Sequence, residues 1–233
     1  MQKRVYALGS IGKEGLCMNR KRIVSFLLLF LALIPCTREL AAQEVLLDDV
    51  IFANGAQPIL DFLRDQQTWD PTQIEVRAKM IRFLGRSSNK GNEDIRSELL
   101  QGMQIGFSKF ASKNNRSLDF WKIRAESALA LARIGETSAI PAIAKLARDD
   151  TDVQVQICAV QALGLLKAGD YVPFLIDLLY LTDHGRLAQE ITRTLGIIGD
   201  KRAFPALLAL TMGYVDANVQ QAAVAAMKML KWQ

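Results

Sequence analysis

The sequence predicts an all-α fold, a right-handed α-solenoid of about ten or eleven helices stacked in pairs. The first observation is an anchor dipeptide that recurs at a fixed 32-residue spacing, as Ala130-Leu131, Ala162-Leu163 and Thr194-Leu195. The second is a proline that follows each anchor after eleven residues, as Pro141, Pro173 and Pro205. Self-similarity at a fixed period of this length indicates stacked helix pairs, each of which buries its apolar face only against its neighbours.

A third observation is a glycine followed by an acid between each anchor and its proline, as Gly135-Glu136, Gly169-Asp170 and Gly199-Asp200. A left-handed glycine commonly ends a helix, and proline is tolerated in the first turn of the next one. Each copy is therefore predicted to be a helix, a tight turn and a second helix. A fourth copy begins at Val219, has Ala226-Met227 in register, and is predicted to stop after one helix.

These phrases resemble HEAT-like repeats of the short class found in bilin lyases and related bacterial proteins. The resembling stretches are ARIGETSAIPAIAKLARD, LGLLKAGDYVPFLIDLL and TLGIIGDKRAFPALLAL, within residues 121–233. The resemblance implies a repeat scaffold, and scaffolds of this kind carry unrelated functions. Bilin lyases and HEAT-like alkylpurine DNA glycosylases share the scaffold, but no catalytic residue of either family transfers to a position of this chain.

Residues 1–42 are predicted to lie outside the fold. Residues 1–17 are interpreted as an upstream extension and residues 18–42 as a signal peptide. This peptide has a basic start, an apolar run from Ile23 to Cys36, and small residues before a cut after Ala42. The apolar run is too short to span a bilayer, which needs about 20 residues. The chain is therefore expected to be exported to the periplasm or envelope, with lipid anchoring through Cys36 as the alternative.

Residues 43–120 are predicted to form N-terminal capping and irregular helix pairs, before the regular repeats of residues 121–233. The expected helices are 44–53, one that opens at 58–63, 72–84, and one from Glu93 to about Ser112. Polar inserts at 86–92 and 113–117 separate the later ones. Such inserts lie at the surface and are favoured places for function.

Charge distinguishes one section of the chain from the rest. Without residues 1–42, basic and acidic groups balance, since 29−7 = 22 and 24−2 = 22. This balance argues against a nucleic-acid partner. Residues 71–134 nevertheless hold twelve bases and six acids. They form a basic zone that either binds lipid headgroups or a polyanion, or is neutralised by the acidic segment 44–70. The candidate residues there are Lys90, Lys109, Lys113 and Arg116.

No pattern for catalysis, metal binding or a cofactor is present. The chain has a single histidine, His184, which is interpreted as a solvated turn residue. The repeated His-Glu pairs of iron-dependent HEAT-like hydroxylases are missing. Cys158 lies between apolar residues and is predicted to be a small buried hydrophobe. We therefore expect a protein that is not an enzyme.

The binding surface is predicted from a stripe on the proline-containing helices. Residues four and seven positions after each proline share a helix face with it, and their chemistry varies while the core positions stay uniform. The stripe consists of Lys145, Arg148, Asp177, Tyr180, Ala209 and Met212. In HEAT-like stacks second helices usually line the concave side, so the resemblance implies that this stripe faces the groove.

The sequence therefore predicts a protein-interaction scaffold or adaptor in the bacterial envelope that binds a protein or peptide through its concave surface. Tyr180 is the predicted anchor, because aromatic residues dominate binding hot spots. The alternative is an envelope lipoprotein or assembly factor that uses the basic zone. A lyase or glycosylase is the least favoured reading, and the sequence leaves the oligomeric state open.

Overall fold

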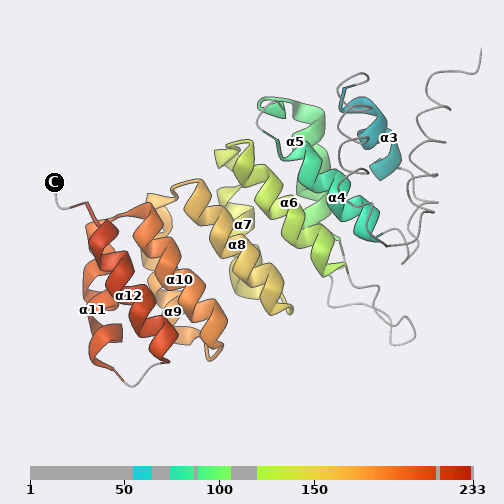
Figure 1. Ribbon diagram of the computed structural model, residues 1–233. Helices are drawn as coiled ribbons and strands as arrows, with labels where there is room; N and C mark the ends of the chain where they lie inside the picture. The colour runs from blue at the N-terminus through green and yellow to red at the C-terminus, as the bar shows by residue number, and fades with distance from the viewer. Residues whose placement is uncertain (1–54, 65–73, 87–88, 106–119, 214–215, 232–233) are drawn as a thin grey trace, which may run out of the picture. The chain divides into compact units, whose positions relative to one another are not determined.

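The computed structural model describes residues 55–64, 74–86, 89–105, 120–213 and 216–231, and every regular element among them is helical. Contacts divide the chain into Met1–Ala53 and Asn54–Gln233. The whole of the first unit lies outside the described residues, so the predicted leader and the predicted helix at 44–53 have no structural account. The second unit is a stack of helices (Figure 1). This confirms the predicted all-α class.

The α-helices fall into two groups on either side of the insert that precedes Trp121. The N-terminal helices are α3 (Gln57–Arg64), α4 (Ile74–Leu84) and α5 (Glu93–Gln104). The regular repeats contain α6 (Trp121–Arg133), α7 (Ile140–Asp149), α8 (Val153–Leu165), α9 (Val172–Leu181), α10 (Gly185–Ile198), α11 (Phe204–Met212) and α12 (Ala217–Met229). The prediction placed the end of α5 near Ser112, but the helix ends at Gln104 because Ile105 adopts an extended backbone.

The helices form two rows in space (Figure 1). The anchor row contains α4, α6, α8, α10 and α12, and each of its members packs on the next. The second row contains α3, α5, α7, α9 and α11. Helices α5, α7, α9 and α11 each make their most extensive contacts with the anchor-row helix that follows in sequence. The packed pairs are thus α7–α8, α9–α10 and α11–α12. The predicted pairing of each anchor-containing helix with the proline-containing helix after it is corrected, and α12 completes a pair with α11.

The anchor dipeptides form the seam of the anchor row. All six residues of the three regular anchors are fully buried. Their first residue is small because another small residue packs against it from the preceding helix. A Cβ added to Gly196 would lie 2.7 Å from the Cα of Ala226, and one added to Gly85 would lie 2.7 Å from the Cα of Ala130. Side chains at these positions would hold the helices apart.

Each second-row helix of the regular repeats begins as the sequence predicts. A short 3₁₀ turn, Thr137–Ala139, Gly169–Tyr171 or Lys201–Ala203, precedes α7, α9 and α11. The proline then lies within the first two helical positions, where its missing N–H costs no hydrogen bond. Glu136 and Asp200 cap the first and third turns by accepting from the backbone N–H groups of Ser138 and Arg202.

The middle turn departs from the prediction. Gly135 and Gly199 adopt the left-handed conformation, both with φ of 78°, but Gly169 does not. Its place is taken by Lys167, with φ of 51°, which lies one repeat period after Gly135 and one before Gly199. Gly169 and Asp170 are two positions out of register. The left-handed residue is therefore set by helix length and not by the glycine.

We expect Gly135→Ala to lower the free energy of unfolding by about 1–2 kcal/mol, because the left-handed conformation strains any residue with a Cβ. Gly169→Ala is the matched control, since its φ is not positive and a Cβ there meets no atom within 4 Å. Urea denaturation of both variants measures the difference. Equal midpoints would contradict the assignment of the left-handed position.

Polar side chains tie the rows together at a position that the sequence did not single out. Four anchor-row helices carry a long polar side chain at one equivalent position, namely Arg77, Arg124, Gln156 and Gln220. In the first three helices this position lies eight residues before the small residue at which the helices meet. Each donates to a backbone carbonyl at the end of the preceding second-row helix, on Leu63, Ile105, Asp150 and Gly213 respectively. These bonds satisfy carbonyls that a helix end would otherwise leave unpaired.

Arg124 also forms a buried ion pair. Its Nε donates to Asp150 Oδ2 at 2.7 Å, and its Nη2 donates to Asp150 Oδ1 at 3.0 Å. The side chains are 8% and 0% exposed. Asp150 additionally accepts from the backbone N–H of Asp152, which caps α8. The pair therefore joins α6 to the turn between α7 and α8.

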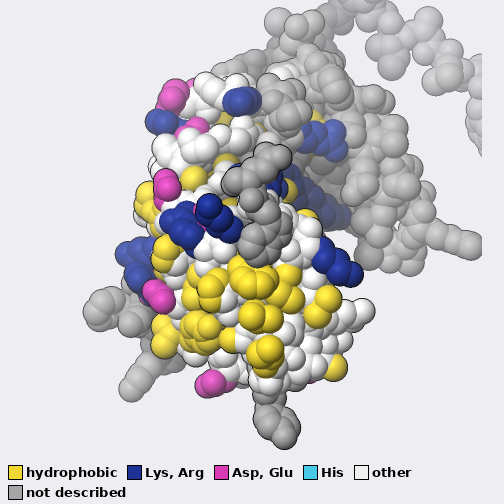
Figure 2. Space-filling model, turned by 90° about the vertical axis from the view of Figure 1, so that its left-hand side faces the viewer, with side chains coloured by type: hydrophobic (Ala, Val, Ile, Leu, Met, Phe, Trp, Pro, Cys, Tyr) yellow, Lys and Arg dark blue, Asp and Glu magenta, His cyan; other side chains and the backbone are white. Residues whose placement is uncertain are grey.

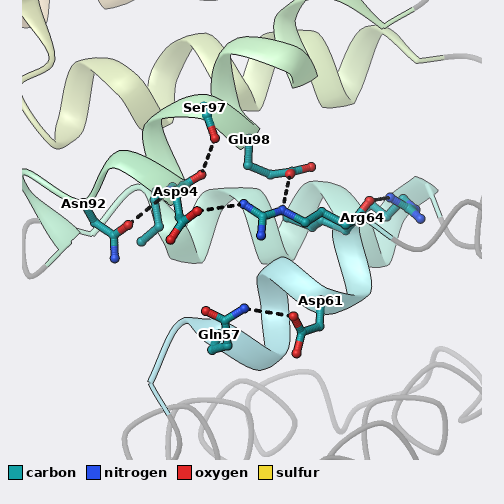
Figure 3. Close-up of polar contacts among 10 residues, drawn as sticks. Gln57, Asp61, Arg64, Asn92, Asp94, Ser97 and Glu98 are labelled. Carbon is teal, nitrogen blue, oxygen red and sulfur yellow. Dashed lines mark hydrogen bonds and ion pairs between the residues drawn. The ribbon is translucent and has the colours of Figure 1, made fainter.

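A second ionic link joins the N-terminal helices. Arg64, at the end of α3, reaches two acids on α5, with Nη2 at 3.2 Å from Asp94 Oδ1 and Nε at 3.3 Å from Glu98 Oε2 (Figure 3). Arg64 and Asp94 are largely exposed, so this link contributes little to stability. It places Asp94 and Glu98 of α5 beside Arg64 of α3.

Candidate functional site

The predicted stripe lies on the surface of the second row. Lys145, Arg148, Asp177, Ala209 and Met212 are all exposed. Tyr180 is 61% exposed and projects from α9. Arg148 pairs with its neighbour Asp149 at 3.0 Å. The residues face solvent as predicted, while a binding role for them stays a prediction.

The stripe and the anchor dipeptides lie on different rows of the stack. Anchor-row helices approach each other at backbone distance, as Gly85 and Gly196 show, whereas α7, α9 and α11 have few contacts with one another. We call the exposed face of the anchor row the inner face. The expectation that the stripe lines the concave side stays a prediction.

The inner face carries a ladder of its own at the repeat period. Glu126, Cys158, Glu190 and Ala222 occupy one position of α6, α8, α10 and α12. None of the four is exposed, and none is fully buried. A second ladder, two turns further along the same helices, runs from Arg133 through Leu165 and Ile197 to Met229. The face thus changes from charged at α6 to mainly apolar at α12.

The inner face is hollowed between α10 and α12. The groove has a volume of about 240 Å³. It is lined by two side chains of α10, Gln189 and Arg193, and by six of α12, namely Asn218, Gln221, Ala222, Ala225, Ala226 and Met229. Side-chain amides donate and accept hydrogen bonds, as a peptide backbone requires. The guanidinium group of Arg193 can bind a carboxylate with two N–H donors.

The two carboxylates of the first ladder, Glu126 and Glu190, form ion pairs with arginines. Glu126 Oε1 accepts from Arg82 Nη2 at 2.5 Å, and its Oε2 lies 3.7 Å from Arg133 Nη1. Glu190 lies 3.6 Å from Arg193 in the α10–α12 groove. The side chain of Arg193 is 56% exposed despite this pair, and it is the one cation among the residues that line the groove. It is therefore the cation that a ligand in the groove would meet.

Cys158 lies between the two carboxylates and is half-buried. The pKa of its thiol is raised to about 11, mainly by burial and in smaller part by the negative charges of Glu126 and Glu190. The thiol is therefore neutral at physiological pH, and the thiolate that acts as a nucleophile is scarce. This agrees with the interpretation of Cys158 as a structural residue, although its side chain is not fully buried.

Ion pairs with acidic side chains neutralise much of the positive charge of the basic zone. Arg82 pairs with Glu126, Arg124 with Asp150, Arg96 with Glu93, and Lys122 with Glu75. The hydrogen bond from Lys122 lowers the pKa of Glu75. Among the four candidate residues only Lys90 is described, and it is exposed. Lys109, Lys113 and Arg116 lie outside the described residues.

Within the part of the chain that the structure describes, no cluster of three or more histidine, cysteine or acidic side chains could hold a metal ion. No described helix is both long enough and apolar enough to cross a bilayer. His184 is an exposed N-terminal flanking residue of α10, and its backbone N–H donates to Thr182 Oγ1.

Sequence reasoning missed the α10–α12 groove because its residues belong to the helices that were assigned to the core. Arg193 and Ala225 are equivalent positions one repeat period apart, with Gln161 and Leu129 before them. This position varies in chemistry just as the stripe does. The same criterion, variation against a uniform core, could have found it if it had been applied to the anchor-containing helices.

Comparison with known proteins agrees with this architecture. The family model of HEAT repeats matches residues 116–192 and 143–228. No curated protein matches the chain. Among solved structures, the complex of CpcE and CpcF of phycocyanin lyase from Nostoc sp. PCC7120 is similar, with 21% sequence identity and a TM-score of 0.57.

That similarity covers 76% of this chain and 65% of the other, so this chain spans less than two thirds of that protein. At this identity the likeness shows the fold alone. The absence of enzyme activity in this chain stays a prediction. The family match, the helical pairs and the repeat register together show that residues 116–228 of this chain are HEAT repeats.

Proposed function

We propose that this protein is an interaction scaffold that holds an extended polypeptide segment on its inner face, in the α10–α12 groove. The observation that carries the proposal is a groove lined both by apolar side chains and by side-chain amides and one guanidinium group. Amides suit a peptide backbone, and Arg193 suits an acidic side chain or a terminal carboxylate. The similar lyase structure, itself a complex of two chains, supports a protein partner.

We further propose that the partner is an envelope protein that meets this chain after export. The basic, apolar and small-residue pattern of residues 18–42 supports this location. The basic zone remains the alternative contact surface through Lys90 and the neighbouring inserts. Ion pairing of its described bases favours the groove over the zone.

A photo-crosslinking residue at position 225 tests the groove directly. Ala225 lines the groove, and exposed Ala209 on α11 provides a matched alanine on the second-row stripe. We expect crosslinking to an envelope protein from position 225 and not from position 209. Arg193→Glu should reduce the yield at position 225 at least about tenfold, because a charge of the wrong sign then faces the partner.

The double variant Tyr180→Ala with Arg148→Ala serves as the control for this experiment, because both changes lie on the second row. It should leave the crosslink at position 225 unchanged. A product from position 209 that depends on Tyr180 would contradict the proposal and restore the stripe as the binding surface. Bands of twice the chain mass would report self-association and are counted separately.

A further inference from the structure

The end of the stack formed by α11 and α12 carries a surface that differs from the equivalent faces of α6, α8 and α10. Position 224 corresponds to Ala128, Val160 and Thr192, which are all 0% exposed because the next helix pair covers them. Val224 is 43% exposed. Thr211 corresponds to the buried Ala147 and Leu179 and is half-buried. No described element covers this face.

This surface, which we call the end face, is made by Thr211 of α11 and by Gln221, Val224, Met227 and Lys228 of α12. Met227 occupies the position of the fully buried anchor leucines and retains partial exposure. Figure 2 shows hydrophobic side chains gathered over this end of the molecule. An apolar centre with a polar rim is the usual anatomy of a protein interface.

Lys228 determines which partner fits. Its position is occupied by Ala132, Gly164 and Gly196 in the other repeats, where a small residue lets helices meet at backbone distance. A further regular repeat therefore cannot pack on α12 in the same way. A helix that runs antiparallel to α12 meets a different pattern, because its residues face α12 in reverse order.

We propose that the end face is the contact between two copies of this chain, with α12 packed antiparallel against α12 of the second copy. Residues 217, 221, 224 and 228 form one stripe of the helix. When Val224 of one copy lies beside Gln221 of the other, Lys228 lies beside Ala217, which leaves room for the lysine stem. The contact repeats itself about a two-fold axis, as a closed dimer requires.

Charge supports the same arrangement. Asp216 is the N-cap of α12, and its Oδ1 accepts from the backbone N–H of Asn218 at 2.7 Å. The antiparallel register brings the ammonium group of Lys228 from each copy to the Asp216 carboxylate of the other. Two such pairs form, one on each side of the axis. The end face is thus complementary to itself in charge as well as in shape.

Sedimentation equilibrium of the purified protein tests the proposal. We expect a concentration-dependent dimer, and Val224→Glu should raise its Kd at least about a hundredfold, because symmetry places the buried charge in the interface twice. Leu165→Glu is the control, since it introduces the same charge at a 55% exposed site on α8. It should leave the Kd unchanged within about twofold.

Cross-linking fixes the register. Cysteines introduced together as Ala217→Cys and Lys228→Cys lie about 16 Å apart on one helix and cannot bond within it. Mild oxidation should join two copies into a disulfide dimer, whereas the parent protein and Leu165→Cys should not cross-link. A monomer at all concentrations, a Kd unaffected by Val224→Glu, or a dimer without this cross-link would each overturn the proposal. So would a monomer whose end face instead binds a different protein.

Discussion

Replacing Asp150 with alanine should lower the free energy of unfolding by about 3–5 kcal/mol, because the change leaves the Arg124 guanidinium buried without its counter-ion. Arg124 retains its bond to the carbonyl of Ile105 at 3.1 Å, but two charge-assisted bonds are lost. The backbone N–H of Asp152 also loses its acceptor. Urea denaturation monitored by circular dichroism measures the loss.

The neighbouring residue supplies a matched control. Asp149 pairs with Arg148, but both side chains are more than a third exposed, so Asp149→Ala should cost at most about 1 kcal/mol. The double variant Arg124→Met with Asp150→Leu should recover most of the lost stability, since an apolar pair can replace a buried ion pair. A loss for Asp150→Ala no larger than that for Asp149→Ala would show that this pair is not buried in solution.

The elements that follow local rules were predictable from the sequence. A fixed repeat period requires helices of repeating length, so the boundaries of α7, α9 and α11 follow from Pro141, Pro173 and Pro205. The burial of the anchors follows from the same register. Local rules do not determine which helices pack together. Chain order suggested that α6 and α7 form a pair, whereas α7 packs on α8, because contacts between rows depend on the whole stack.

The candidate site was less predictable for the same reason. Counting charges placed Arg77 and Arg124 in a solvent-facing basic zone, but both are buried and bonded to segments elsewhere in the sequence. The α10–α12 groove joins residues one repeat period apart on neighbouring helices. Its existence depends on how closely those helices approach, and only the structure shows that spacing. The middle turn is a smaller example, because the sequence predicted the left-handed conformation at Gly169 and the structure has it at Lys167.

Leu163→Ala should lower the free energy of unfolding by about 2–5 kcal/mol, the range for removing a large side chain from a core. Leu163 is fully buried in α8, and α8 packs on α6, α7 and α10. The cavity that the substitution leaves is therefore surrounded by helices that other contacts hold in place. These helices cannot easily move in to fill it. In a repeat stack, each unit also depends on its neighbours, so a defect in the middle weakens interfaces on both sides.

Gln161→Ala, two residues earlier on the same helix, is the control for this prediction. Gln161 is only partly buried on the inner face, so its change should cost far less than that of Leu163. Leu131→Ala and Leu195→Ala should resemble Leu163→Ala, because all three leucines are fully buried at one repeated position. Denaturation midpoints for Leu163→Ala and Gln161→Ala that coincide would mean that the repeat register does not describe the core, and the packing of the anchor row would need another explanation.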